Sequence, residues 1–194
     1  FFKILKNENL TKLIYCSILI SLISTLIIYF DNIYRPDANL YHLPYTKIVN
    51  ENKMIIGISN IHFRFGHVSI IQYLNAIFNN YLFKDYGVIM PAAIIFSSIV
   101  LYFWKEINKN IIKNKIYCYY IFLLLSYIRY GYNRYSEFGN DTIAHLYFFF
   151  LSSYFLKEKF INDIDDKEFF KISILSLYCF MLKTSLVFAL LFPF

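Results

Sequence analysis

The stretch YGVIMPAAIIFSSIVLYFW, residues 86–104, runs for 19 residues without a charged side chain. A helix needs about 20 apolar residues to cross the hydrocarbon layer of a bilayer, so this length is close to sufficient. Trp104 closes the stretch, and tryptophan favours the membrane–water interface. Residues 86–104 therefore predict a membrane-spanning helix.

The composition of the whole chain also indicates a membrane protein. Its 194 residues are 58% hydrophobic and 22% aromatic, and only 16% are charged. In a soluble domain about a quarter of the residues are charged, so this chain has too few polar side chains to cover its own surface. We therefore expect an integral membrane protein of the all-α class.

Further apolar segments approach the length of a span, namely 13–30, 116–130, 142–156 and 170–192. Together with 86–104 they predict a polytopic fold of five transmembrane helices, in one transmembrane domain that covers 1–194. Two of them, 116–130 and 142–156, are short for a span, at about 15 residues each. The chain begins at Phe1 without a methionine and stops inside a hydrophobic run, which indicates a fragment of a longer polypeptide.

The basic residues predict an orientation. Lysine is dense before the first segment, in KEINKNIIKNK (105–115) and in KEKFINDIDDKEFFK (157–171), but sparse in the long loop 31–85. Because cytoplasmic loops carry the excess of Lys and Arg, we expect a cytoplasmic N-terminus and outward-facing loops at 31–85 and 131–141. This signal accounts for the net charge of +6, and we expect no nucleic-acid partner. The Ile-, Asn- and Lys-rich composition suggests a bacterium, hence a multi-pass protein of the inner (cytoplasmic) membrane.

The outer loop 31–85 has a helical pattern of its own. In HVSIIQYLNAIFNNYLF (67–83) apolar residues recur every three or four positions, which predicts an amphipathic helix on the membrane surface. Residues 41–56 predict a second interfacial helix. The segment GISNIHFRFG between them predicts a turn with Gly57 and Gly66 at its ends.

Two residues at the start of this loop are candidates for chemistry. Asp37 follows the first apolar segment, and a carboxylate beside the bilayer is partly desolvated, so it is either paired or used. We take Asp37 as the candidate catalytic residue. His42 can act as an acid or base near neutral pH. The alternatives are that Asp37 caps a helix starting near Tyr41 and that His42 is an ordinary hydrogen-bonding residue.

The turn contributes His62, Arg64 and His67 in the pattern H-x-R-x-x-H. An Arg between two histidines would repel a cation, so the pattern does not indicate zinc. Arginine offers fixed donors that suit phosphate, and histidine can add another. We expect these residues, with His42, to bind a phosphate group. A structural tie between two parts of the loop is the alternative.

The other candidates for phosphate binding are Asp141 and Lys183. Asp141 opens the fourth segment on the same outer side as Asp37, although helix capping alone would explain it. Asp141 and His145 share a helix face and are the candidate ligands of a divalent metal, which stays possible. Lys183 lies inside the fifth segment, where an ammonium costs about 3 kcal/mol. It should therefore face an acidic partner or an anionic ligand, unless it extends to the interface.

The motif DANLYHLPY (37–45), followed by GISNIHFRFGHVSIIQYLNAIF (57–78), resembles a group of bacterial membrane proteins with a D-x-x-x-Y-H-L-P and G-x-x-N-x-H-x-R-F-G pattern. More widely, the arrangement resembles the multi-spanning GT-C glycosyltransferases, such as protein mannosyltransferases and lipid A aminoarabinose transferases. The resemblance implies that Asp37 is the base or orients the acceptor, that Asp141 is a second acidic site for carrier phosphate or metal, and that Lys183 pairs with carrier phosphate. The chain departs from many members by having Ala38 after Asp37 instead of a second acid.

The resemblance implies a glycosyltransferase that moves a sugar from a polyprenyl-phosphate donor to an envelope acceptor on the outer face. The expected partners are this donor and the lipid bilayer, while the acceptor stays open. One alternative is a non-enzymatic component that transports or polymerises lipid-linked sugars, and another is a structural membrane subunit. A transporter should contain interrupted helices. Here Gly and Pro lie mainly at segment edges, which favours uninterrupted ones.

Overall fold

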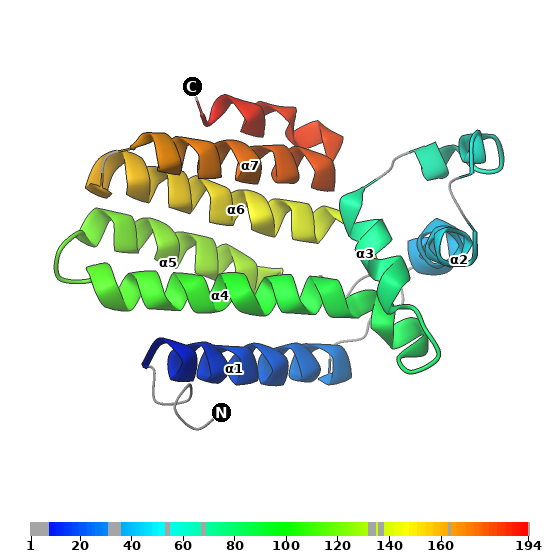
Figure 1. The fold of residues 1–194 in the computed structure, drawn as a ribbon, viewed down its shortest axis with the longest axis horizontal. Coiled ribbons are helices and arrows are strands. Elements are labelled where there is room, and N and C mark those ends of the chain that lie inside the picture. Colours follow the sequence, from blue (N-terminus) through cyan, green and yellow to red (C-terminus); the bar gives the residue numbers. More distant parts are fainter. Residues whose placement is uncertain are drawn as a thin grey trace.

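The computed structural model describes residues 8–30, 36–52, 55–66, 69–131, 135, 138–162 and 164–193. All regular secondary structure in these residues is helical, so the expected all-α class is confirmed (Figure 1). The elements, with short 3₁₀- and π-helices written η, are α1 (Glu8–Phe30), η1 (Ala38–His42), α2 (Leu43–Glu51), η2 (Ile58–Asn60), η3 (Phe63–Gly66), α3 (Ile70–Phe78), η4 (Lys84–Ile89), α4 (Met90–Asn110), α5 (Lys115–Tyr130), α6 (Asp141–Lys157), η6 (Glu158–Asn162), α7 (Asp166–Leu182) and η7 (Thr184–Leu191).

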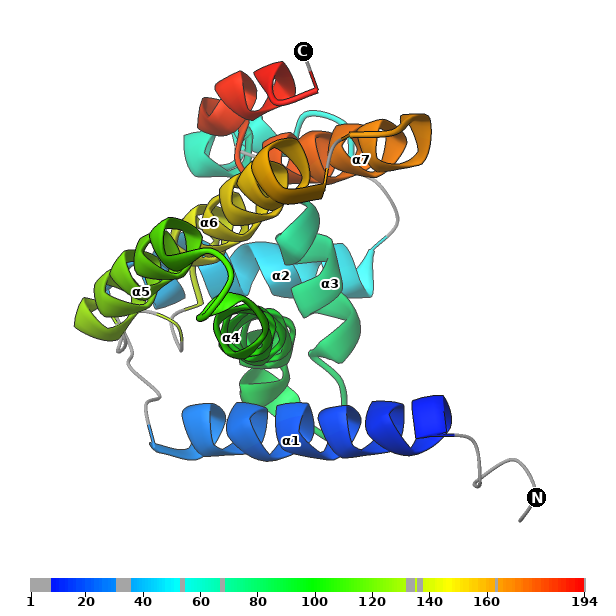
Figure 2. The same cartoon turned by 90° about the vertical axis from the view of Figure 1, so that its left-hand side faces the viewer.

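Helix α4 is the centre of the bundle. It packs against α1 on one side and against α5 and α6 on the other, with α3 across its first turn (Figures 1 and 2). Of its apolar stretch 56% is buried, against 11% for α1, which makes α4 the helix around which the others pack. The core that it shares with α5, α6, α7 and η7 is apolar and includes Ala93, Phe96, Phe103, Ile121, Ile143, Leu146, Leu151, Leu182 and Ala189.

Helix α1 crosses α4 obliquely and leaves most of its surface uncovered (Figure 2). Small side chains form the crossing. The hydroxyl of Ser24 lies 3.0 Å from that of Ser97 and 3.2 Å from the backbone oxygen of Ala93. Small residues with hydroxyl groups let two helix backbones approach closely, which is typical of helix pairs in membranes.

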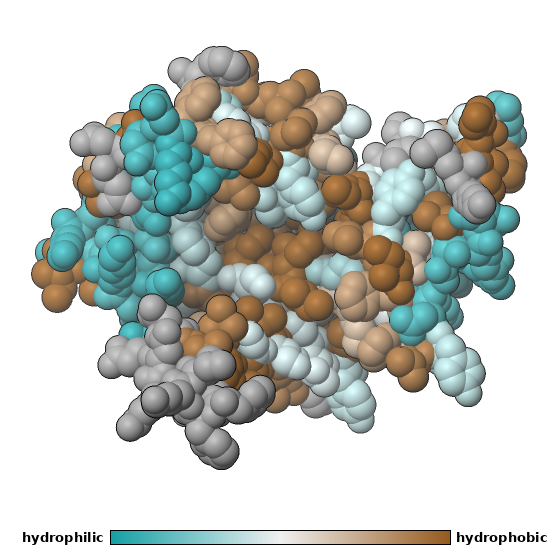
Figure 3. All heavy atoms as spheres, in the orientation of Figure 1, coloured by the Kyte–Doolittle hydropathy of each residue, from teal (hydrophilic) through white to brown (hydrophobic). Residues whose placement is uncertain are grey.

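Two helical stretches of the described chain, Leu10–Tyr29 and Lys84–Asn110, are long and apolar enough to cross a membrane. Helices α5, α6 and α7 have 16, 17 and 17 residues, at or below the lower limit for a span. On the face drawn in Figure 3, apolar side chains occupy the middle, and polar ones gather at the left end and around α2. Five spans therefore stay a prediction, with two helices of clearly sufficient length.

Two short helices, α2 and α3, lie across one end of the bundle (Figure 1), which we call the α2–α3 end. Helix α3 starts in a capping box, because the N–H of Ser69 donates to the side chain of Gln72 at 3.0 Å. Both helices are shorter than the expected 41–56 and 67–83. Helix α3 stops at Phe78, after which the side-chain oxygen of Asn80 accepts from two backbone N–H groups and forms a turn.

The fifth apolar segment, expected as one continuous helix over 170–192, is interrupted. Helix α7 ends at Leu182, and Lys183 is extended, with φ −156° and ψ 120°. The chain then turns back, and η7 packs along α7 (Figure 1). The expectation of an uninterrupted span is therefore wrong. The terminal carbonyl of Leu182 is satisfied by the hydroxyl of Ser69, which donates to it at 2.6 Å.

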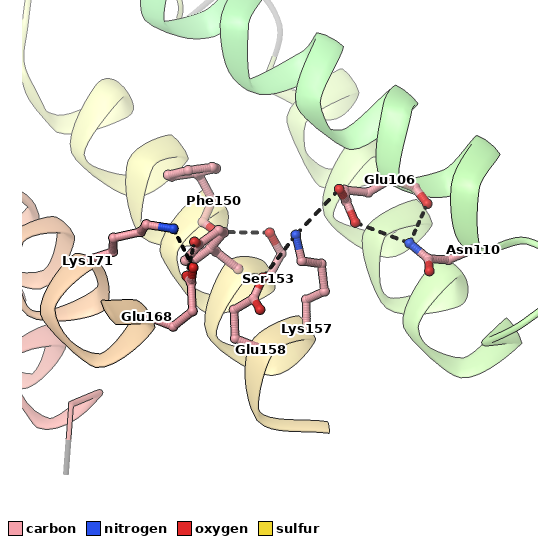
Figure 4. A network of polar contacts seen from close by, with 9 residues as sticks. Glu106, Asn110, Phe150, Ser153, Lys157, Glu158, Glu168 and Lys171 are labelled. Carbon is pink, nitrogen blue, oxygen red and sulfur yellow. Dashed lines mark hydrogen bonds and ion pairs between the residues drawn. The ribbon is translucent and has the colours of Figure 1, made fainter. Parts of the chain in front are cut away.

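The opposite end of the bundle contains buried charges in segments that the sequence predicts as connecting loops, 105–115 and 157–171. The helices extend further than expected, so α4 includes Glu106 and α6 includes Lys157. Lys157 Nζ lies 3.6 Å from Glu106 Oε1 and 3.0 Å from Glu158 Oε1, and both glutamates are at least 94% buried (Figure 4). These charges tie α4 to the end of α6, and they do not form a solvated loop.

The contact between η4 and α3 provides a test of this packing. A Cβ on Gly87 would lie 1.9 Å from the carbonyl oxygen of Phe78. Gly87→Ala should therefore reduce the free energy of unfolding by about 1–3 kcal/mol, because backbone would have to move. At Gly131 a Cβ would lie 3.9 Å from its nearest neighbour, so Gly131→Ala is the matched control. Equal melting temperatures for the two variants in detergent would contradict the close approach.

Candidate functional site

The α2–α3 end brings Asp37 and Tyr41 together. Asp37 directly precedes η1, and Tyr41 lies four residues further on the same face. The Tyr41 hydroxyl donates to Asp37 Oδ2 at 3.1 Å. The Asp37 carboxylate is exposed and does not cap a helix, which removes the simplest structural explanation for it. Partial burial, with the hydrogen bond to Asp37, raises the pKa of Tyr41, so the phenol stays a proton donor.

A stack of rings lies beside this pair. The ring centroids of Tyr41 and His62 are 6.2 Å apart with planes 14° from parallel, and those of His62 and Phe63 are 5.1 Å apart at 23°. The Arg64 guanidinium carbon lies 5.4 Å from the centroid of Tyr41 and 5.2 Å from that of Phe63. We call Tyr41, His62, Phe63 and Arg64 the ring stack. Cation–π contacts hold Arg64 while leaving it exposed to a ligand.

Lys183 has an acidic partner, as predicted from the position of its charge within an apolar segment. Its Nζ lies 3.0 Å from Asp141 Oδ2, at the first residue of α6. The Lys183 side chain is 28% exposed and that of Asp141 is 66% exposed. The ammonium therefore reaches the open end of the bundle, and a solvated carboxylate is its partner.

Asp37 with the ring stack, and the ion pair of Lys183 with Asp141, belong to one cluster of side chains. The charges of Asp37, Asp141 and Arg64 all act on the imidazole of His42, and the same three act on the Tyr41 hydroxyl. The structure thus brings together residues from the start of η1, from η3 and from α6, which lie far apart in the sequence. Lys183 joins them through Asp141.

His42 differs from the other candidates because it is buried. The residue is 8% exposed, and its Nδ1 has no hydrogen-bond partner in the part of the chain that the structure describes. The ring packs on Gly139, where a Cβ would lie 3.3 Å from His42 Nε2. Burial lowers the pKa of His42, and the charges of Asp37 and Asp141 only partly oppose this, so the ring is neutral at pH 7. In this conformation His42 lies beneath the site and does not face a phosphate.

Among the described residues no group of three or more His, Cys, Asp or Glu side chains could hold a metal ion. Asp141 and His145 both lie exposed at the start of α6. This candidate pair of metal ligands therefore gains no third His, Cys, Asp or Glu ligand from the described residues. A divalent metal at this pair stays a prediction. His67 lies outside the described residues.

Sequence reasoning missed two contributors to the site. Tyr41 had a signal, since it lies four residues after Asp37 on a helical segment. Gly139 had none, because its importance is its closeness to His42, a residue nearly a hundred positions away.

The ion pair between Asp141 and Lys183 should contribute little to stability. With two partly exposed side chains, the coupling between Asp141→Asn and Lys183→Gln in a double-mutant cycle should stay below about 1 kcal/mol. Thermal unfolding of the two single variants and the double variant measures it. A coupling of several kcal/mol would mean that the pair serves to hold α6 to α7 and is not available to a ligand.

His42 predicts a pH dependence of stability. Because its pKa in the folded protein is below the usual value of about 6.5, the unfolded chain takes up this proton more readily. This contribution is fully present above pH ~6.5 and is lost as the pH falls toward the folded-state pKa. His42→Gln should therefore flatten the loss of melting temperature between about pH 7 and 5. His62→Gln controls for removal of an imidazole, and an unchanged slope in His42→Gln would contradict the assignment.

Comparison with known proteins gives one match. No curated protein and no solved structure matches the chain. The match to a protein family covers residues 1–194. The chain therefore belongs to the family described as Domain of unknown function (DUF8201).

Proposed function

We propose that the chain forms part of a membrane glycosyltransferase that moves a sugar from a polyprenyl-phosphate donor to an acceptor on the outer face of the bacterial inner membrane. One observation carries the proposal. An exposed carboxylate, Asp37, lies in the same cluster as the exposed guanidinium of Arg64 and the half-buried ammonium of Lys183, at one end of the bundle.

The chemistry of such a transfer fits these groups. The acceptor hydroxyl oxygen forms a bond to the anomeric carbon of the donor, and the bond from that carbon to the phosphate oxygen breaks. Asp37 takes the proton from the hydroxyl. Arg64 and Lys183 stabilise the negative charge on the departing polyprenyl phosphate. Tyr41 orients Asp37 by donating to Oδ2, so that Oδ1 stays free for the acceptor.

The position of the cluster supports a lipid-linked donor. Lys183 directly follows the apolar end of α7, whereas the turn that carries Arg64 lies beyond the ends of α4 and α6 (Figure 1). A polyprenyl phosphate needs an apolar environment for its hydrocarbon chain. It also needs cations for its phosphate, at the boundary between the apolar environment and water. When no donor is bound, the Lys183 ammonium pairs with the Asp141 carboxylate. A carrier phosphate would take the place of that carboxylate beside Lys183.

A second function is favoured by the interruption at Lys183. Transporters bind substrate where a helix is broken, and α7 and η7 meet at such a break beside Ser69 and Asp141. A non-enzymatic component that moves lipid-linked sugars would use the same cations without proton transfer by Asp37.

Replacement of Asp37 separates the two functions. In membranes that contain the full-length protein, Asp37→Asn should reduce release of polyprenyl phosphate from polyprenyl-phosphate sugars by about a hundredfold or more. Asp85→Asn, which removes another exposed carboxylate of the same loop, is the matched control and should retain release. Full release by Asp37→Asn at equal expression would exclude Asp37 as the base. No release by any form, with retained binding of the carrier, would favour transport.

A further inference from the structure

Two members of the ring stack, His62 and Phe63, have no role in the proposed transfer step, in which Tyr41 and Arg64 act. Phe63 is 67% exposed, although an exposed aromatic ring forgoes the stabilisation of burial. The turn that carries it extends beyond the ends of α4 and α6, away from the apolar middle of the bundle (Figure 1). The ring is therefore open to a ligand that approaches the α2–α3 end.

Hydrogen-bond donors border this apolar face. The backbone N–H of Arg64 donates to His62 Nδ1 at 3.3 Å, which places the proton of the neutral ring on Nε2. His62 thus offers a donor at the edge of the stack. The exposed Arg64 guanidinium adds further donors in a fixed plane above Phe63. A flat apolar surface with donors along its edge is complementary to a sugar ring, which has an apolar C–H face and hydroxyl oxygens around it.

We infer that the ring stack binds a carbohydrate acceptor, a pyranose unit of a glycan chain. Its C–H face rests on Phe63, and its hydroxyl oxygens accept from Arg64 and His62 Nε2. The inference rests on the proposed function and names its acceptor class. Tyr41 connects the sugar site to the catalytic carboxylate, because it stacks on His62 and donates to Asp37 at 3.1 Å. A hydroxyl of the bound sugar is thereby brought to the carboxylate that takes its proton.

A lipid surface is the competing occupant of an exposed aromatic side chain. The surroundings of Phe63 favour a sugar, because the acyl chains of a bilayer would leave the donors of His62 and Arg64 without partners. The Asp37 carboxylate beside the stack would also repel anionic head groups.

The test measures binding of soluble sugars to the full-length protein in phosphatidylcholine nanodiscs. The probes are methyl glycosides and trisaccharides of glucose, mannose, galactose and N-acetylglucosamine. Saturation-transfer NMR measures their binding. Phe63→Ala should weaken the tightest-binding probe by about three- to tenfold, the value of one aromatic contact. Phe63→Trp should retain binding. Phe160→Ala removes a ring that is 71% exposed on η6, at the other end of α6, and should change nothing.

Each contrary result has a defined meaning. Absence of saturable binding for all probes, or equal affinity in Phe63→Ala, overturns the inference. In a background in which Trp104 and every other tryptophan of the full-length protein are replaced by Phe, emission from Phe63→Trp that brominated lipids quench and sugars leave unchanged would assign the stack to the bilayer and also overturn the inference. Asp37→Asn keeps the two proposals apart. If this variant binds sugar normally and still transfers it, the role of Asp37 fails while the sugar site stands.

Discussion

The arrangement of the α2–α3 end depends on the interruption of the last apolar segment at Lys183. An unbroken helix would continue through residues 184–192, whereas the break ends α7 at Leu182 and leaves Lys183 extended, with its ammonium beside Asp141. The break frees the carbonyl of Leu182, and a buried carbonyl without a partner costs about 1–3 kcal/mol. Ser69 removes that cost by donating to it. Because Ser69 is also the N-cap of α3, the same residue fixes where α3 meets the bundle.

The two ends of the bundle treat charge in opposite ways. At one end Lys157 is enclosed by Glu106 and Glu158, with little access to solvent (Figure 4). Loss of one member would leave a buried charge without a partner, so this group maintains one geometry. At the other end Asp141 and Lys183 are partly solvated, and their separation costs little. A ligand can therefore exchange with Asp141 at one end, while the other end keeps the helices in place.

Much of the fold could be predicted from the sequence, because the signals are local. Apolar length predicts the helices, and the spacing in 67–83 predicts the amphipathic α3, although Asn79 and Asn80 end it early. The expected alternation of inner and outer loops placed Asp37, Arg64, Asp141 and Lys183 on one side, and these residues do lie at one end of the bundle. The break at Lys183 could not be predicted, since it depends on Ser69, more than a hundred residues earlier. The burial of His42 likewise depends on Gly139, a contact between distant segments that no periodicity encodes.

The serines at the crossing of α1 and α4 have a consequence for how the protein is made. Ser24 also donates to the carbonyl of Ile20 in its own helix at 2.6 Å, and Ser97 donates to that of Ala93 at 2.7 Å. Each hydroxyl is thus satisfied before the helices meet. In the proposed membrane setting, α1 can enter the lipid from the translocation machinery before α4 does, because its Ser24 hydroxyl is already hydrogen-bonded. Docking onto α4, synthesised some sixty residues later, then adds the contacts of the Ser24 hydroxyl with Ser97 and with the Ala93 oxygen and requires no dehydration step.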